Sequence, residues 1–438
     1  MLDNLYDFLS SRYLYTSMLS IPHEYMRLVG RDPFEVGAVA FLSALYDFQM
    51  RVSLIRSRFL EIIYYLSGKR IGVFDLLDDK YFEDMLGKLL EKTSFFHRFD
   101  RSAALFKILL RTYYETDWES LIPSIEGDID VGIAEHIYHK TMDSAPSKEL
   151  AGLLNRFLSR KKSSPHKRIN LFLRWMTRDE YPDLGLWSSI IDKKRLLVPL
   201  GTEIARTAAR VFLGRTKELP RSRKSVYLVT SILRSINPKD PVKYDFVLSR
   251  PMILGLCNKD MEYSYCWVCP LKSICEAASR IDPEIQRRVF KEKLRIMDET
   301  KRYDRIHNIV LNKGVKYIYE KYVDRLGLIC SSDRSVDHGL RPDFFCDHSS
   351  PITLVAEAKT STRSKEAPVQ LRTYIDELRI RETSNKKYFA FLIFGKHDPV
   401  ELGHIIETLY LTNTTRVADR IEIIIVEKEP PIIINIKS

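Results

Sequence analysis

Apolar and polar positions follow a helical period over roughly the first 295 residues. Segments 32–68 and 103–115 carry apolar residues three and four positions apart, with few turn residues inside them. Short polar linkers separate such segments, at 143–149, 161–167 and 237–241. The pattern predicts a mostly helical region that ends in a charged helical connector at 282–311.

The pattern changes after about residue 325. Short runs of β-forming residues occur between polar turns, at 325–332, 351–360, 386–395 and 420–428. Helical stretches alternate with them, at 301–325, 366–382 and 398–413. We therefore expect an all-α body over residues 1–280, a helical connector over 281–300 and an α/β domain over 301–438.

Length and composition place the chain among soluble proteins of more than one domain. Its 438 residues exceed what one hydrophobic core ordinarily serves, and 45% hydrophobic with 29% charged residues is a globular balance. The N-terminus lacks the basic and then apolar stretches of a signal peptide. No run approaches the roughly 18 apolar residues of a membrane span, so we expect a cytoplasmic protein.

The positive charge is concentrated in one part of the chain. The formal net charge is +11, whereas residues 151–250 alone hold 22 Lys and Arg against 8 Asp and Glu, a net of +14. The other 338 residues therefore carry about −3. Such a concentration is the electrostatic signature of a polyanion partner, and we predict DNA. A solvated basic surface without a partner is the alternative.

Eight cations of this region are the candidate contacts to DNA phosphates. They are Arg168, Arg174, Arg178, Lys193, Lys194, Arg195, Arg206 and Arg210. For any one of them, the alternative is a solvated surface residue that does not contact DNA. Trp175 and Trp187 are expected in the core rather than stacked on bases.

Four of the six cysteines lie within nineteen residues, at Cys257, Cys266, Cys269 and Cys275. The spacing C-x8-C-x2-C-x5-C holds no histidine, and in a large intracellular protein it indicates a metal site rather than disulfides. Four thiolates suit a [4Fe–4S] cluster or, as the alternative, a tetrahedral Zn²⁺. The remaining two, Cys330 and Cys346, are expected to be buried thiols.

This loop, with Pro270 after its third cysteine, resembles the C-terminus of the endonuclease III group of helix-hairpin-helix DNA glycosylases. Those proteins hold a [4Fe–4S] cluster on C-x6-C-x2-C-x5-C, so the first gap here is two residues longer. Segments 167–190 and 196–214 resemble an uncharacterised family related to these glycosylases. The resemblance covers roughly residues 15–280 and implies a DNA-binding body whose cluster is structural.

One departure from the glycosylase pattern concerns catalysis. Active members place an aspartate before a helix, in a pattern like V-D-T-H, where it stabilises positive charge on the sugar. In the matching segment PLGTEIAR, Gly201 stands at the aspartate position and Glu203 at that of the histidine. Glycine has no side chain for this chemistry, so base excision, with Glu203 as a substitute, is only an alternative function.

The segment from Arg341 to Thr362 contains another candidate active site. Residues two apart on a strand share a face, so Glu357 and Lys359 point the same way. Asp343, 14 residues before Glu357, fits on a neighbouring antiparallel strand. Two carboxylates suit Mg²⁺ or Mn²⁺, and a nearby lysine can neutralise developing charge. Strands with charged outer faces are common, which is the plainer interpretation.

Gln370 and Tyr374 follow, four residues apart and so on one face of an expected helix. Asp-x13-Glu-x-Lys followed by Gln-x3-Tyr resembles the PD-(D/E)XK nuclease superfamily, restriction-endonuclease-like in fold, and within it the RecB-like branch. The resemblance covers roughly residues 300–438. It implies metal binding by Asp343 and Glu357, catalysis by Lys359, and a DNA-facing pair in Gln370 and Tyr374.

The same resemblance implies a supporting residue on the first helix of the domain. RecB-like members use an early histidine, which matches His307, and other branches use a later glutamate, which matches Glu320. Thirteen residues of helix separate the two by about 20 Å, so they do not share one ion. His307 is preferred because Gln-x3-Tyr belongs to the same branch.

Residues and resemblances together predict a metal-dependent deoxyribonuclease that acts in DNA repair or recombination. Its α/β domain would cut the phosphodiester and its iron–sulfur body would bind DNA. A DNA glycosylase or lyase is the first alternative, and a non-catalytic DNA-binding scaffold is the second.

Overall fold

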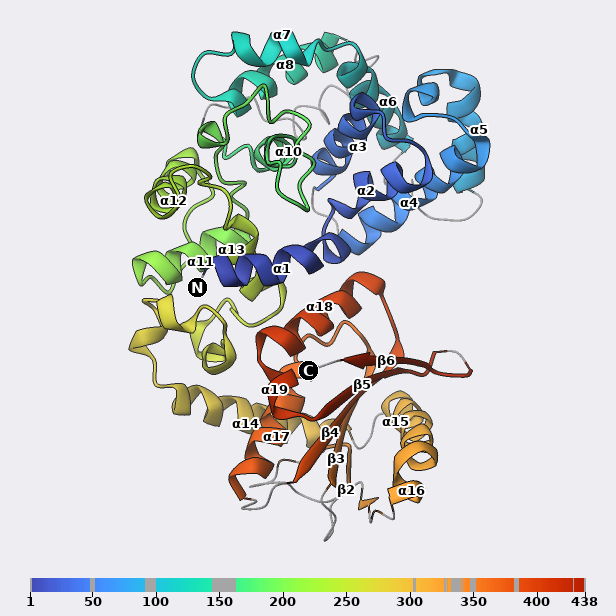
Figure 1. Cartoon of the computed structure of the whole chain (residues 1–438), viewed down its shortest axis with the longest axis vertical. Coiled ribbons are helices and arrows are strands. Elements are labelled where there is room, and N and C mark those ends of the chain that lie inside the picture. Colours follow the sequence, from blue (N-terminus) through green and yellow to red (C-terminus); the bar gives the residue numbers. More distant parts are fainter. Residues whose placement is uncertain are drawn as a thin grey trace. The chain divides into compact units, whose positions relative to one another are not determined.

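The computed structural model describes residues 2–47, 52–90, 100–143, 163–301, 305–326, 328, 330–331, 340, 342–346, 352–381, 386–427 and 429–436 (Figure 1). Contacts divide the chain into two compact units. The helical unit comprises residues 1–205 and 219–248, and the sheet unit comprises residues 206–218 and 249–438. Each unit is treated by itself below.

The helical unit contains ten α-helices among its described residues. They are α1 (Leu2–Thr16), α2 (Ser20–Leu28), α3 (Pro33–Leu45), α4 (Val52–Lys69), α5 (Asp79–Leu90), α6 (Asp100–Tyr114), α7 (Trp118–Ser124), α8 (Ile129–Asp143), α10 (Lys167–Thr177) and α12 (Arg223–Ile236). Two further helices, α11 (Thr202–Leu213) and α13 (Asp245–Ile253), continue from this unit into the sheet unit.

Helix α3 forms the centre of the helical unit. It begins where Asp32 accepts a hydrogen bond from the Glu35 N–H and Pro33 occupies the first turn, both favourable at a helix start. Every residue from Val36 to Leu45 is buried, because this helix has apolar or small residues on all of its sides. It packs against α2, α6 and α10. Trp175 and Trp187 are 1% and 6% exposed, which confirms their predicted place in the core.

The sheet unit is built on one mixed sheet whose strands follow chain order. They are β1 (Cys330–Ser331), β2 (Phe344–Cys346), β3 (Ile352–Ser361), β4 (Lys387–Lys396), β5 (Arg420–Ile425) and β6 (Ile432–Ile436). Strands β3, β4 and β5 are parallel, and the outer pairs are antiparallel. Its helices are α14 (Pro283–Lys301), α15 (Arg305–Ile318), α16 (Asp324–Leu326), α17 (Ala367–Arg381), α18 (Pro399–Leu411) and α19 (Thr414–Val417).

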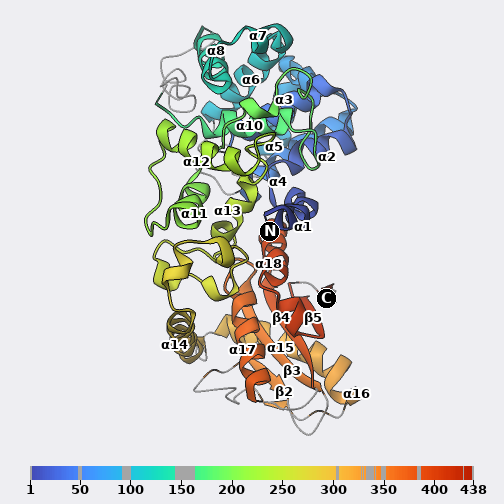
Figure 2. The same ribbon diagram turned by 60° about the vertical axis from the view of Figure 1, so that its left-hand side comes forward.

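Helices α15 and α17 cover opposite faces of this sheet (Figure 1; Figure 2). On the α15 side, Val310 and Ile318 pack with Ala356 and Ala358 of β3 in a buried apolar core. Because side chains alternate along a strand, Glu357 and Lys359 of β3 lie on the α17 side. The sheet thus separates its main apolar core from the charged residues that the sequence singled out.

The helical N-terminal region and the α/β C-terminal part confirm the coarse prediction from the sequence. The contact division does not follow the expected connector at 281–300, because the cysteine loop packs with the sheet unit. The interpretation of Cys330 and Cys346 as free thiols is wrong: they form a disulfide between β1 and β2. Within the described ranges, no helix is long and apolar enough to cross a bilayer.

Candidate functional site

The two candidate carboxylates come from neighbouring antiparallel strands, as predicted. Phe344 of β2 pairs with Ala356 of β3, so the register places Asp343 opposite Glu357 at the end of the pairing. The Ala358 backbone N–H donates a 2.7 Å hydrogen bond to Asp343 Oδ2. This bond orients the Asp343 carboxylate, although Asp343 lies just outside its strand.

Lys359 is held between two partners on the α17 side of the sheet. Its Nζ lies 2.7 Å from Glu357 Oε1 and donates a 2.8 Å hydrogen bond to Gln370 Oε1. Gln370 Nε2 donates in turn to the Tyr374 hydroxyl, at 2.9 Å. A four-residue polar chain therefore runs from the strand into α17.

Gln370 and Tyr374, predicted to face DNA, lie buried between α17 and β3. Both residues are 0% exposed, because the helix face that carries them packs directly on β3. Their contacts instead fix the position and orientation of the Lys359 ammonium. Buried polar chains of this kind specify one arrangement when every member is satisfied.

Of the two first-helix candidates, only His307 joins the group. Its Nε2 lies 3.1 Å from Asp343 Oδ2 and 3.1 Å from the Ala358 carbonyl oxygen, and the residue is 5% exposed. Glu320 is exposed on a short π-helical turn (Tyr319–Val323) at the other end of α15. The imidazole therefore buttresses Asp343, and Glu320 is not part of the site.

Asp343 and Glu357 offer the donor atoms that a divalent cation needs. Carboxylate oxygens are hard ligands, and Mg²⁺ commonly takes only one or two of them and completes its shell with water and substrate phosphate. In the parts of the chain that the structure describes, no three His, Cys, Asp or Glu side chains surround a common point. Asp343 and Glu357 thus supply two carboxylates for such an ion, and Glu357 itself is 0% exposed.

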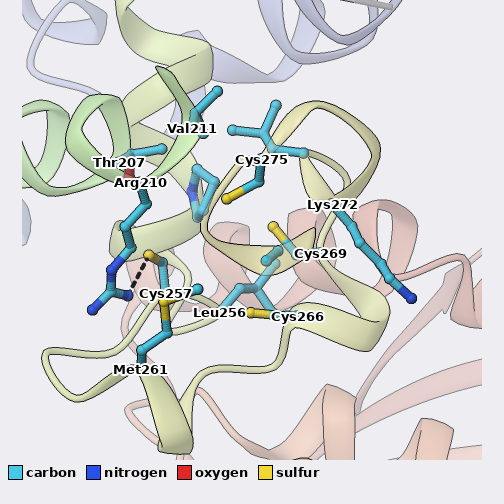
Figure 3. A pocket seen from close by; sticks show the side chains of 13 residues that line it. Thr207, Arg210, Val211, Leu256, Cys257, Met261, Cys266, Cys269, Lys272 and Cys275 are labelled. Carbon is cyan, nitrogen blue, oxygen red and sulfur yellow. Dashed lines mark hydrogen bonds between the residues drawn. The ribbon is translucent and has the colours of Figure 1, made fainter. Parts of the chain in front are cut away.

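The four clustered cysteines surround one cavity in the sheet unit (Figure 3). Short 3-10 turns at Cys266–Val268 and Lys272–Ile274 bend the loop around it. The four sulfurs line one shared space, so a metal centre bound there would meet thiolates from all four. Both a [4Fe–4S] cluster and a tetrahedral Zn²⁺ take four thiolates, so the residues present fit either group.

Hydrogen-bond donors are already directed at these sulfurs. Arg210 Nη1 donates to Cys257 Sγ at 2.9 Å (Figure 3). Gln286 Nε2 donates to Cys266 Sγ at 3.5 Å. Backbone N–H groups of Leu271 and Ala278 donate to Cys269 and Cys275 respectively. Burial raises the pKa of the Cys266, Cys269 and Cys275 thiols, so charged thiolates need both these donors and a bound metal.

Several cations assigned to DNA phosphates are buried, and that assignment is wrong for them. Arg174 and Arg178 are 0% exposed, Arg210 is 1% exposed and Arg206 is 8% exposed. Arg210 is occupied at the cysteine loop, and Arg206 pairs with Glu218 at 2.8 Å. None of the four presents its guanidinium to a solvent-side phosphate.

Arg174 and Arg178 belong to an ion network inside the helical unit. Asp183 pairs with both, at 3.1 Å to Arg174, while Asp240 and Asp245 each pair with one. Burial alone would lower the pKa of Arg178, but the carboxylates of Asp183 and Asp240 raise it above its ordinary value. Burial raises the pKa of Asp183, and that of Asp245 to about 6. The network holds the loop after α10 against α13.

The other predicted cations differ in their exposure. Burial lowers the pKa of Arg168 to about 10, and its Nη1 donates to the Leu45 carbonyl, so it is a structural residue. Lys193 pairs with Asp179 at 2.7 Å near the surface. Lys194 and Arg195 are exposed and remain candidates for phosphate contact.

On α12, two exposed cations that the sequence analysis did not name lie in the same unit as the predicted Lys194 and Arg195. Lys224 and Arg234 are exposed on the outer face of α12 with Tyr227, and Arg234 Nη2 donates to the Lys194 carbonyl at 3.1 Å. We call Lys194, Arg195, Lys224, Tyr227 and Arg234 the α12 surface. Helical spacing was the available signal, since 224, 227, 231 and 234 fall on one side of the helix.

At the position where a glycosylase would carry its aspartate, Gly201 directly precedes α11. A Cβ placed there would meet Glu203 Oε2 at 2.6 Å and Lys167 Cε at 3.1 Å. Glu203 thus lies against the bare α-carbon, while Lys167 Nζ pairs with Asp47 at 2.8 Å. Any side chain at 201 requires Glu203 to move.

Comparison with known proteins gives one result. A family model described as "Protein of unknown function (DUF2400)" matches residues 19–254, more than half of the chain. No curated protein and no solved structure matches. The matched region ends before Cys257, so neither the cysteine loop nor the sheet is part of it.

Proposed function

The chain belongs to the DUF2400 family, and we propose that it is a metal-dependent deoxyribonuclease of DNA repair or recombination. Its sheet unit would be a PD-(D/E)XK nuclease of the RecB-like branch. Its helical unit would be a helix-hairpin-helix glycosylase-like body that binds DNA. The observation that carries the proposal is the pairing of Lys359 with Glu357 on β3, next to Ala358, whose N–H bonds to Asp343. His307 lies 3.1 Å from the same Asp343 carboxylate.

The residues of this group divide the proposed work among them. Asp343 and Glu357 would hold Mg²⁺ or Mn²⁺, which when bound supplies an activated water and stabilises charge on the phosphate. His307 and the Ala358 N–H keep the Asp343 carboxylate in one orientation. Lys359, fixed by Gln370, places a positive charge where the phosphate becomes more negative.

The direct test is a cleavage assay on the purified full chain. Single-stranded, duplex, flap and lesion-bearing DNA are incubated with Mg²⁺, with Mn²⁺ or with chelator. Metal-dependent cutting of any substrate is expected. Release of a damaged base without metal-dependent cutting would favour the glycosylase alternative. DNA that stays unchanged on every substrate would favour the scaffold alternative.

The proposed [4Fe–4S] cluster gives a separate prediction about composition. Protein purified without oxygen should be brown and contain about four iron atoms per chain. Cys269→Ser should lose most of this iron, because Cys269 is one of four thiols around the cavity. Metal analysis and visible absorption measure both outcomes. A colourless protein with one zinc per chain would contradict the cluster and leave the zinc alternative.

The α12 surface is the part of the helical unit that we propose for duplex contact. Lys194, Lys224 and Arg234 replaced together by alanine should weaken binding and flatten its salt dependence. Each lost phosphate contact reduces the slope of log K against log salt by about 0.9. Fluorescence anisotropy with a labelled duplex in chelator measures binding without cleavage.

A matched control for this surface is Arg27→Ala. Arg27 lies on α2 in the same unit, and its side chain is 63% exposed. It pairs with Glu24 and does not belong to the α12 surface. It should leave the salt slope unchanged. Equal slopes for the wild type, the triple variant and this control would exclude the α12 surface as a DNA contact.

A further inference from the structure

The cysteine loop touches α17 through Tyr265, the residue before Cys266. Tyr265 is 4% exposed, and its ring packs against Phe290 at 4.8 Å and Trp267 at 5.4 Å. Its hydroxyl donates a hydrogen bond to the Glu366 carboxylate. The aromatic packing leaves this hydroxyl little freedom, so a shift of Cys266 is transmitted to Glu366.

Glu366 is the residue immediately before α17, and it is fastened on more than one side. Lys293 of α14 donates to its carboxylate, and its backbone carbonyl accepts the Gln370 N–H at 2.9 Å. The neighbouring Lys365 donates from Nζ to the Ile253 carbonyl at 2.6 Å, at the end of α13. Two adjacent residues therefore attach the first turn of α17 to the chain on either side of the cysteine loop.

The atoms at this attachment approach closely at two positions. Gly255 has a φ of +75°, which suits glycine, and a Cβ added to it would meet Lys365 Cβ at 3.3 Å. Gln286 of α14 is 2% exposed and joins the Met261 carbonyl to Cys266 Sγ. The loop, α14 and the start of α17 thus form one continuous contact.

The first turn of α17 also carries the residue that holds Lys359. Gln370 is bonded to Glu366 through its backbone and to Lys359 through its side chain. A displacement of Glu366 consequently moves Gln370, whose side-chain oxygen accepts the hydrogen bond from the Lys359 ammonium. Misplacing a catalytic group by about 1 Å can cost up to about a hundredfold in rate.

We infer that the metal-loaded cysteine loop positions Lys359 through the contact between Tyr265 and Glu366, so that cleavage depends on the loop being loaded. This inference rests on the proposed nuclease function. Tyr265 and Glu366 act here as positioning residues, because neither touches the carboxylate pair. Without a metal, only hydrogen bonds such as those from Arg210 and Gln286 hold the thiols around the cavity, so we expect Tyr265 to be held less firmly.

Hydrogen exchange tests the coupling without any cleavage. Two samples of the full chain are compared, one with metal bound at the cysteine loop and one from which that metal has been stripped. Amide exchange is followed over residues 367–374 in both. We expect the Gln370 amide, which bonds to Glu366, to exchange at least about tenfold faster in the stripped protein. Unchanged protection of this turn on metal loss would overturn the inference, whether or not the protein cuts DNA.

Two variants test the same contact in the loaded protein. Tyr265→Phe removes only the hydroxyl, and Glu366→Ala removes its acceptor. Both should keep the metal content of the loop while kcat falls by about tenfold to a hundredfold and KM stays constant. Tyr263→Phe is the matched control, since Tyr263 belongs to the same loop but is 51% exposed.

The outcomes of the kinetic test are distinct. A kcat for Tyr265→Phe and Glu366→Ala equal to that of Tyr263→Phe, at full metal content, would refute the coupling while the nuclease function stands. If the wild type itself does not cut, the nuclease proposal fails, and the exchange experiment alone decides whether loop and helix are coupled.

Discussion

Lys359→Met should reduce metal-dependent cleavage by about a hundredfold to a thousandfold. Methionine keeps the length of the side chain, which is 7% exposed, but removes the charge that Glu357 and Gln370 hold in place. Single-turnover rates with enzyme in excess over a labelled substrate measure the chemical step directly. DNA affinity in chelator should stay near that of the wild type, because Lys359 lies away from the surface.

The control for this loss is a lysine outside the group. Lys396→Met changes an exposed residue at the end of β4 and should leave the rate unchanged. Asp343→Asn should match Lys359→Met, and Glu320→Gln should match the control, since Glu320 is exposed and away from Asp343. Wild-type rates in Lys359→Met and Asp343→Asn would mean that the chemistry lies elsewhere in the chain.

Asp183→Ala should cost about 3–5 kcal/mol of folding free energy in the helical unit. The carboxylate is fully buried and pairs with two arginines, so its removal leaves Arg174 and Arg178 with excess buried charge. Urea unfolding followed by tryptophan fluorescence is a suitable measurement, because Trp118, Trp175 and Trp187 all lie in this unit. The midpoint should move to clearly lower urea.

Asp179→Ala is the matched control for this network. Asp179 also pairs with a cation, Lys193, but its side chain is 57% exposed, and surface pairs contribute about 1 kcal/mol or less. The two aspartates are four residues apart on the same loop. Similar urea midpoints for the two variants would show that the buried network contributes little to stability.

The sequence predicts the placement of the candidate residues on the sheet because that geometry is local. Alternation along one strand places Glu357 beside Lys359, and a spacing of 14 residues brings Asp343 opposite Glu357 through one hairpin. Helical periodicity likewise puts Gln370 and Tyr374 on one face. Which way that face points depends on the packing of α17 on β3, so the burial of the pair could not be predicted from local spacing.

The DNA-contact residues were harder to predict because net charge carries no information on burial. Arg174 lies between Leu173 and Trp175 on a helix whose neighbours are nearly all buried, a sign that it faces inward. Its acidic partners, Asp183 and Asp245, follow 9 and 71 positions later, so no local pattern reveals the pairing. The disulfide between Cys330 and Cys346 was missed for a similar reason, since strand pairing alone brings the two together.

That disulfide gives the sheet unit two sulfur chemistries with opposite requirements. The loop cysteines can bind a metal only as reduced thiolates, whereas Cys330 and Cys346 are joined by oxidation at the strand that leads from Asp343. A strong reductant that protects the loop would also open the link between β1 and β2. An assay of the proposed nuclease therefore needs a redox buffer chosen for both.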